Sequence, residues 1–128
     1  EAIVYGRLPL MITENCLVQN ETGCRLDRQG PCVPEDGPCR CGQPNVLVDR
    51  TGAAFPLLPA YGHRTEIQNS KPLYLADRPE HRRLGLAYAR LRFTTETAEE
   101  CVSVVQNYLD AAPAAGDFTR GLYERGVE

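Results

Sequence analysis

Cysteine is the residue type in this sequence with the clearest chemical potential, and its spacing is uneven. The chain has six cysteines, and five of them lie in one segment: Cys16, Cys24, Cys32, Cys39 and Cys41. Glycines and prolines separate these cysteines, and large apolar side chains are scarce, so a hydrophobic core cannot order the segment. We expect its thiols to be tied together by a metal ion, an iron–sulfur cluster or disulfides.

The distribution of the cysteines favours a metal over disulfides. Cys101 lies far from the others, in a predicted helix, and leaves an odd number in the segment, as expected for metal binding in a reducing, cytoplasmic compartment. Cys39-x-Cys41 can offer two thiols to one ligand, although the segment lacks the paired C-x2-C knuckles of a zinc ribbon. A neutral imidazole of His63 could complete a three-thiolate site, or His63 could be an ordinary loop residue.

No familiar catalytic motif accompanies the cysteines. The sequence contains no nucleophile elbow, P-loop, Gly-x-Gly-x-x-Gly or His-Glu-x-x-His string. Cys16 and His63 could formally serve as nucleophile and base, but the local sequence does not support this pairing. Catalytic residues are therefore left unassigned. The predicted metal ligands are Cys16, Cys24, Cys39, Cys41 and His63.

Composition limits the other functions. The chain has 128 residues, 42% of them hydrophobic and 24% charged, which is typical of a soluble globular domain. A net charge of −3 creates no basic field for nucleic acid. No apolar run approaches the roughly 18 residues of a membrane span, and no signal peptide is recognisable. Because Met11 is the only methionine and Glu1 opens an expected strand, we interpret the chain as a piece of a longer polypeptide.

The elements around the cysteine segment are expected to be mainly strands in the first half. Residues 2–12 are apolar and predict a buried strand interrupted at Gly6 and Pro9. Residues 45–57 predict a β-hairpin whose turn, residues 49–52, ends in a glycine.

The second half predicts strands that alternate with helices. Residues 67–75 indicate an extended segment, and the next segment, 77–85, has the capping pattern of a short helix. Residues 86–93 alternate between apolar and polar positions, which predicts a strand. A helix from Thr97 to Ala112 should follow, with Cys101 in its apolar stripe as a core residue.

This alternation predicts an α/β fold built from parallel β-α-β units. Two such units cannot close a barrel, so we expect a fragment of a (β/α) barrel with a β-hairpin and a Cys-rich loop at residues 14–45. Residues 1–112 would form the barrel part, and residues 113–128 a linker or an arm. The isolated fragment would expose strand edges, so a homo-oligomer is expected in addition to contacts with the rest of its own polypeptide.

Five blocks of the sequence resemble the collagenase-like peptidases. In order, they are VYGRLPLMITENC (4–16), VDRTGAAFPLL (48–58), EIQNSKPLYLADR (66–78), ARLRFTTET (89–97) and FTRGLYERGV (118–127). The blocks span nearly the whole chain. The resemblance implies the later part of the family's barrel, in a family whose members are classed as proteases. Several bacterial relatives instead support oxygen-independent hydroxylation of RNA or of a quinone precursor.

The resemblance also implies a cofactor. Those relatives hold a four-iron, four-sulfur cluster on four cysteines, and Cys16, Cys24 and the Cys39/Cys41 pair match the first positions of that pattern. The family's last cysteine is expected between the Phe-Pro and Asn-Ser strings, where His63 is the only good ligand of this sequence. The sequence therefore predicts an iron–sulfur cluster or zinc. The alternative is a structural metal-binding or interaction module without catalysis of its own.

Overall fold

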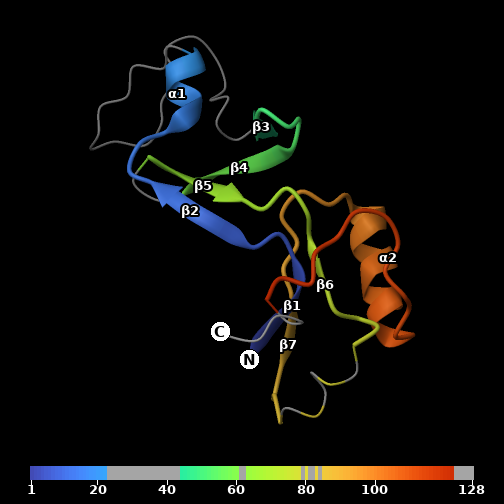
Figure 1. The fold of residues 1–128 in the computed structure, drawn as a ribbon. Helices are drawn as coiled ribbons and strands as arrows, with labels where there is room; N and C mark the ends of the chain where they lie inside the picture. Colours follow the sequence, from blue (N-terminus) through green and yellow to red (C-terminus); the bar gives the residue numbers. More distant parts are fainter. Residues whose placement is uncertain (23–43, 61–62, 79, 81–82, 84, 123–128) are drawn as a thin grey trace. The chain divides into compact units, whose positions relative to one another are not determined.

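The computed structural model describes residues 1–22, 44–60, 63–78, 80, 83 and 85–122. The chain divides into two compact units, drawn in Figure 1. The first unit combines Glu1–Leu8 with Lys71–Glu128, and the second is Pro9–Ser70. Each unit has its own sheet and its own buried side chains.

The sheet of the first unit has three strands, with β1 (Ala2–Gly6) in the middle. β6 (Leu73–Tyr74) runs antiparallel to β1, and β7 (Ala89–Leu91) runs parallel to it on the other side (Figure 1). The apolar sequence of β1 suits this central position, where Val4 and Tyr5 are buried.

Helix α2 (Ala98–Leu109) begins with the capping box that the sequence predicts. The Thr97 hydroxyl accepts a hydrogen bond from the Glu100 amide (3.3 Å), and the Glu100 carboxylate accepts one from the Thr97 amide (2.7 Å). Val104 and Tyr108 from the helix pack against buried residues of the sheet. Val104 and Tyr108 therefore cover part of the core of the first unit, whereas Val105 is exposed and Cys101, predicted as a core residue, is only partly buried.

The sheet of the second unit has four strands, all antiparallel, in the order β2-β5-β4-β3. Their bounds are β2 (Pro9–Thr13), β3 (Asn45–Val48), β4 (Ala54–Ala60) and β5 (Arg64–Gln68). β2 and β3 are the outer strands, and β4 and β5 supply the buried residues of the sheet.

The predicted hairpin is confirmed as β3 and β4. The Asp49 carboxylate organises its turn by accepting hydrogen bonds from the amides of Thr51 (2.7 Å) and Ala53 (3.0 Å). The hydroxyl of Thr51 also donates to Asp49 (2.7 Å), and this bond is the main reason that the pKa of Asp49 is lowered. Gly52 has a φ of 85°, a left-handed conformation that glycine adopts without steric cost.

Helix α1 (Leu17–Thr22) follows β2 and completes the core of the second unit. Cys16 and Val18 are buried against Leu57 of β4 and Ile67 of β5. This small cluster is the part of the second unit where α1 meets the sheet.

The expected fragment of a (β/α) barrel is wrong. The described residues form two sheets with seven strands and only two helices, and neither sheet closes into a barrel. A parallel β-α-β unit requires a helix that crosses between two parallel strands. β6 and β7 instead lie on opposite sides of β1, and β6 is antiparallel to it.

None of the described residues of the stretch 77–85, where the sequence predicts a helix, is α-helical. The sequence predicts that Asp77 caps a helix over residues 77–85, but both oxygens of its carboxylate bind Arg120 instead. Among the described residues of this stretch, Asp77 and Gly85 lie in turns, and Glu80 and Arg83 have 3₁₀ conformation. The strand predicted over residues 86–93 is also shorter, because only β7 pairs with a neighbour.

The interruptions predicted by glycine and proline are confirmed. The apolar segment 2–12 divides at Gly6 and Pro9 into β1 and β2, which belong to different sheets. The extended segment 67–75 likewise divides into β5 and β6, with Pro72 just before β6.

The described part of the C-terminal segment belongs to the first unit. Thr119 forms a parallel bridge with Leu73. Whether residues 113–128 also act as a linker or an arm in a longer protein stays a prediction. Among the described residues, no helix combines the length and apolarity that crossing a bilayer requires.

Candidate metal centre

One end of the second unit's sheet gathers the chain segments that carry the predicted ligands. β2 ends at Thr13, which pairs with Thr65 near the start of β5, and Ala60 at the end of β4 pairs with Arg64. β3 begins beside the middle of β4, because Asn45, its first residue, pairs with Leu57, and it runs away from this end of the sheet. We call this end of the sheet, where β2 and β4 end and β5 begins, the ligand end.

The ligand end includes both described residues that the sequence predicts as metal ligands. Cys16 comes three residues after the end of β2, and His63 immediately precedes β5. The other predicted cysteines lie between Thr22, the last residue of α1, and Asn45, the first of β3. The pairing of β2 with β5 thus brings the chain segments of Cys16 and His63 to the same end of the sheet.

Cys16 directly precedes α1, and its carbonyl accepts a hydrogen bond from the Gln19 amide (3.2 Å). Its side chain is only 8% exposed and packs among apolar residues of the unit's core. Within the described part of the chain, its thiol is free. A ligand in this position would hold a metal at the boundary between the apolar core and the ligand end.

His63 directly precedes β5, whose first residue, Arg64, pairs with Ala60 at the end of β4. Its φ of 59° lies in the left-handed region, which histidine adopts more readily than bulky or β-branched residues do. The residue is partly buried. This backbone conformation sets the direction in which the Cα–Cβ bond of His63 points.

Side-chain contacts bind the Cys16 segment to the strand that begins after His63. Arg64 forms an ion pair with Glu14, with two hydrogen bonds of 3.0 and 3.1 Å to one carboxylate oxygen. Both side chains are substantially exposed, so the pair contributes only about 0–1 kcal/mol, and its main consequence is geometric. The next residue, Thr65, binds the backbone on both sides of Cys16 through its hydroxyl.

The remaining predicted ligands, Cys24, Cys39 and Cys41, lie outside the described residues, as does Cys32. Across the described part of the chain, no three His, Cys, Asp or Glu side chains form a group suited to a metal ion. The structure therefore brings the Cys16 and His63 segments to one end of a sheet, and the full ligand set stays a prediction. Cys101 belongs to α2 in the first unit.

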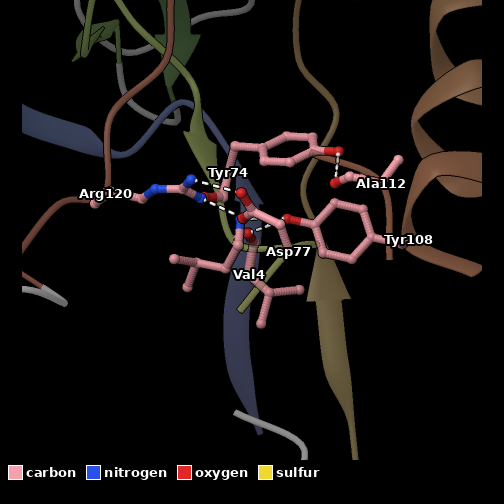
Figure 2. A network of polar contacts seen from close by, with 7 residues as sticks. Val4, Tyr74, Asp77, Tyr108, Ala112 and Arg120 are labelled. Atoms are coloured by element: carbon pink, nitrogen blue, oxygen red, sulfur yellow. Dashed lines mark hydrogen bonds and ion pairs between the residues drawn. The ribbon is translucent and has the colours of Figure 1, made fainter. Parts of the chain in front are cut away.

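The first unit contains a polar network that sequence reasoning missed (Figure 2). The Tyr108 hydroxyl accepts from the Leu75 amide (2.8 Å) and donates to the carbonyl of Val4. Burial raises the pKa of Tyr108 to about 12, so the phenol stays protonated and able to donate at neutral pH. Tyr74 similarly donates to the carbonyl of Ala112 (3.0 Å).

An ion pair completes this network. Arg120 binds both oxygens of the Asp77 carboxylate and the carbonyl of Tyr74, and its guanidinium lies 4.6 Å from the centre of the Phe118 ring. The hydrogen bond from Arg120 is the main cause that lowers the pKa of Asp77. Since these contacts join backbone segments of the first unit to one another, we assign the network to stability.

The sequence anticipates only part of this network. Tyr108 falls in the apolar stripe predicted for its helix, so its inward position could be anticipated, but the partners of its hydroxyl could not. Arg120 follows a glycine-rich stretch that the sequence analysis interprets as a linker or an arm. Nothing local to Arg120 indicates that it binds a carboxylate 43 positions earlier.

Comparison with known proteins adds no relatives. A scan against protein-family models finds no match to this sequence. Searches of curated proteins and of solved structures likewise find no match. The class defined by the structure is thus a mainly β chain of two units, one of which carries a cysteine-bearing ligand end.

Proposed function

We propose that the ligand end of the second unit holds a metal ion or an iron–sulfur cluster. The ligands in this proposal are Cys16, Cys24, Cys39, Cys41 and His63. The observation that supports it is that Thr13, three residues before Cys16, pairs with Thr65, two residues after His63, at one end of the second unit's sheet.

The donor set suits two kinds of group. Thiolates with one imidazole match a tetrahedral zinc ion, and four thiolates, or three with a histidine, match an iron–sulfur cluster. Zinc would supply structural stability or Lewis acidity, and a cluster would supply electron transfer. In either case, the described residues would contribute Cys16, which follows β2, and His63, which precedes β5.

For the full-length protein, we propose the activity implied by the resemblance to the collagenase-like peptidases. That activity is proteolysis or cluster-dependent hydroxylation of RNA or of a small molecule. The proposed partners are the rest of its own polypeptide, a second copy of the chain and, through the full-length protein, RNA. The proposed location is the cytoplasm, where thiols stay reduced.

One observation favours the alternative function, a structural metal-binding module without catalysis. Cys16 lies in the buried cluster formed with Val18, Leu57 and Ile67, so a metal bound there would be coupled directly to packing of the second unit. Metal removal should then lower the stability of the unit, whatever chemistry the full-length protein performs.

Metal analysis of the full chain, purified without oxygen, tests the proposal. We expect zinc or iron at a fixed ratio to protein, with brown colour and broad visible absorption if the group is a cluster. Cys41→Ser and His63→Ala should each lower the metal content, because each removes a proposed ligand. Cys101→Ser is the matched control, since Cys101 lies on α2 and should not change it.

Two results would contradict the proposal. The first is wild-type protein that is folded, colourless and free of zinc and iron. The second is metal content that Cys101→Ser lowers as much as Cys41→Ser does. Stoichiometric zinc without colour would retain the metal site and select the structural module over the redox function.

A further inference from the structure

Helix α2 has apolar side chains on more of its surface than the first unit uses. Val104 and Tyr108 pack against the buried residues of the sheet. On another side of the helix, Val102, Val105 and Leu109 are 70%, 41% and 72% exposed. No residue of α2 is buried, so the helix lies at the surface of its unit.

The three exposed side chains form one row along the helix. Val102, Val105 and Leu109 follow one another at intervals of three and four residues, which places them on the same side. This is the spacing with which the apolar face of one helix packs against another helix. We call this row of three residues the exposed stripe. It offers about two helical turns of apolar surface to a partner.

The charged residues of α2 and its caps are all acidic. Glu99 precedes Val102 by three positions, and Asp110 caps the C-terminal end, where its carboxylate accepts a hydrogen bond from Gln106 (2.9 Å). The segment 97–110 contains no Lys, Arg or His. Because the C-terminal end of a helix is already negative, Asp110 adds to the negative potential there instead of balancing it. Both ends of the exposed stripe therefore favour a cation.

We propose that the exposed stripe of α2 is a docking surface for an amphipathic helix of a partner protein, one that carries lysine or arginine beside its apolar face. The partner's apolar side chains cover Val102, Val105 and Leu109, and its cations lie near Glu99 and Asp110. This surface is independent of the proposed metal site, because α2 belongs to the first unit.

Two other occupants match the charges less well. If α2 packed against α2 of a second copy, acidic residues would lie beside acidic residues, whether the two helices ran parallel or antiparallel. A bilayer that contains anionic lipids attracts helices with basic flanks, and α2 has acidic ones. A basic amphipathic helix satisfies both the apolar row and the charges at its ends.

Two synthetic peptides provide the probe. Each is about 18 residues long, enough to form a helix, and has leucines at helical spacing on one face. The first peptide has lysine at the positions that flank the leucines, and the second has glutamate there. Binding of each peptide to the full chain is measured by isothermal titration calorimetry. The lysine peptide should bind at least about 10-fold more tightly than the glutamate peptide.

Substitutions in the stripe separate apolar docking from general attraction of a cation. Leu109→Gln should weaken binding of the lysine peptide by about 10-fold, because a leucine covered by the partner becomes polar. Val46→Gln is the matched control, since Val46 is a 56% exposed apolar residue on β3 in the second unit. It should leave binding unchanged.

A second pair of variants tests the charges. Glu99→Gln should weaken binding of the lysine peptide and reduce the difference between the two peptides. Glu21→Gln is the matched control, because Glu21 is an exposed acidic residue on α1 in the second unit. Circular dichroism establishes that each variant is folded. If Leu109→Gln does not fold, Val102→Gln applies the same test to the stripe.

Several outcomes would overturn the proposal. Folded wild-type protein that does not bind the lysine peptide, or that binds both peptides equally, would do so. An equal loss of binding in Val46→Gln and Leu109→Gln would show that the stripe is not the site. A dimer in light scattering that Leu109→Gln dissociates would assign the stripe to a second copy. Binding to vesicles of phosphatidylcholine and phosphatidylserine that Leu109→Gln abolishes would assign it to a membrane surface.

Discussion

Arg120 binds Asp77 through two parallel hydrogen bonds, of 2.6 Å to one carboxylate oxygen and 2.8 Å to the other. Both side chains are largely buried, in contrast to the exposed pair between Lys71 and Asp117 in the same unit. The bidentate contact fixes the described C-terminal segment beside β6, where Thr119 also forms its bridge.

Arg120→Ala should lower the free energy of unfolding by about 1–3 kcal/mol, since a charged hydrogen-bonded pair is lost and Asp77 remains partly buried. Lys71→Ala, which breaks the exposed pair, should change it by about 1 kcal/mol or less. Urea unfolding at neutral pH measures both values. Equal effects of the two substitutions would show that Arg120 does not stabilise the unit in this way.

The same ion pair predicts a pH dependence. Arg120 lowers the pKa of Asp77 in the folded protein, so folded Asp77 binds a proton less readily than unfolded Asp77 does. Its stabilising contribution is therefore complete well above the unfolded pKa of about 3.9 and is lost as pH falls through the lower folded value. The stability difference between wild type and Arg120→Ala should be constant from pH 7 to about pH 5 and should shrink below about pH 4. A difference that grows with acidity would contradict this account.

The Tyr108 hydroxyl should contribute measurably to the free energy of unfolding of the first unit. Tyr108→Phe keeps the ring but leaves the Val4 carbonyl and the Leu75 amide without this partner, both in buried residues, at a cost of about 1–3 kcal/mol. Tyr88→Phe is the matched control, because Tyr88 is 71% exposed. Chemical unfolding of the two variants should show a loss for Tyr108→Phe alone.

Gly6 should tolerate no side chain. Its φ is 121°, and an added Cβ would lie 2.0 Å from the carbonyl oxygen of Arg92, a backbone atom that cannot move aside cheaply. The conformation alone costs a non-glycine residue about 1–3 kcal/mol, and the clash adds to this. Gly116→Ala is the control, because Gly116 also has positive φ (74°) but no atom within 4 Å of an added Cβ. Gly6→Ala should lower the melting temperature far more than Gly116→Ala does.

The capping box of α2 predicts a smaller effect. Thr97→Ala removes the hydroxyl that accepts from Glu100, so it should cost about 1 kcal/mol. Ser103→Ala, at an exposed position within the same helix, should be neutral or slightly stabilising. If both variants unfold at the same denaturant concentration, the box does not contribute to stability.

Sequence patterns predicted the local structure well where one short stretch determines it. The hairpin turn depends on Asp49 and Gly52, and the start of α2 depends on Thr97 and Glu100, all within a few residues of each other. The breaks at Gly6 and Pro9 follow from the same local rules.

The fold could not be predicted because it depends on contacts between distant segments. Alternating strand and helix patterns suggested parallel units, but the placement of β1 between β6 and β7 joins residues that lie far apart in the chain. Asp77 has the local pattern of a helix cap, and its binding to Arg120 overrides that pattern. The cysteine spacing indicated the identity of candidate ligands, whereas the contact of the Thr65 hydroxyl with the Leu17 amide appears only once β2 and β5 are paired.

The most direct test of the metal-binding account is the zinc and iron content of wild-type full chain purified without oxygen, measured beside Cys16→Ser. The account predicts metal at a fixed ratio to wild-type protein, and a substantial loss of that metal in Cys16→Ser. Folded wild-type protein without either metal, and with all six cysteines reactive toward a thiol reagent, would contradict it.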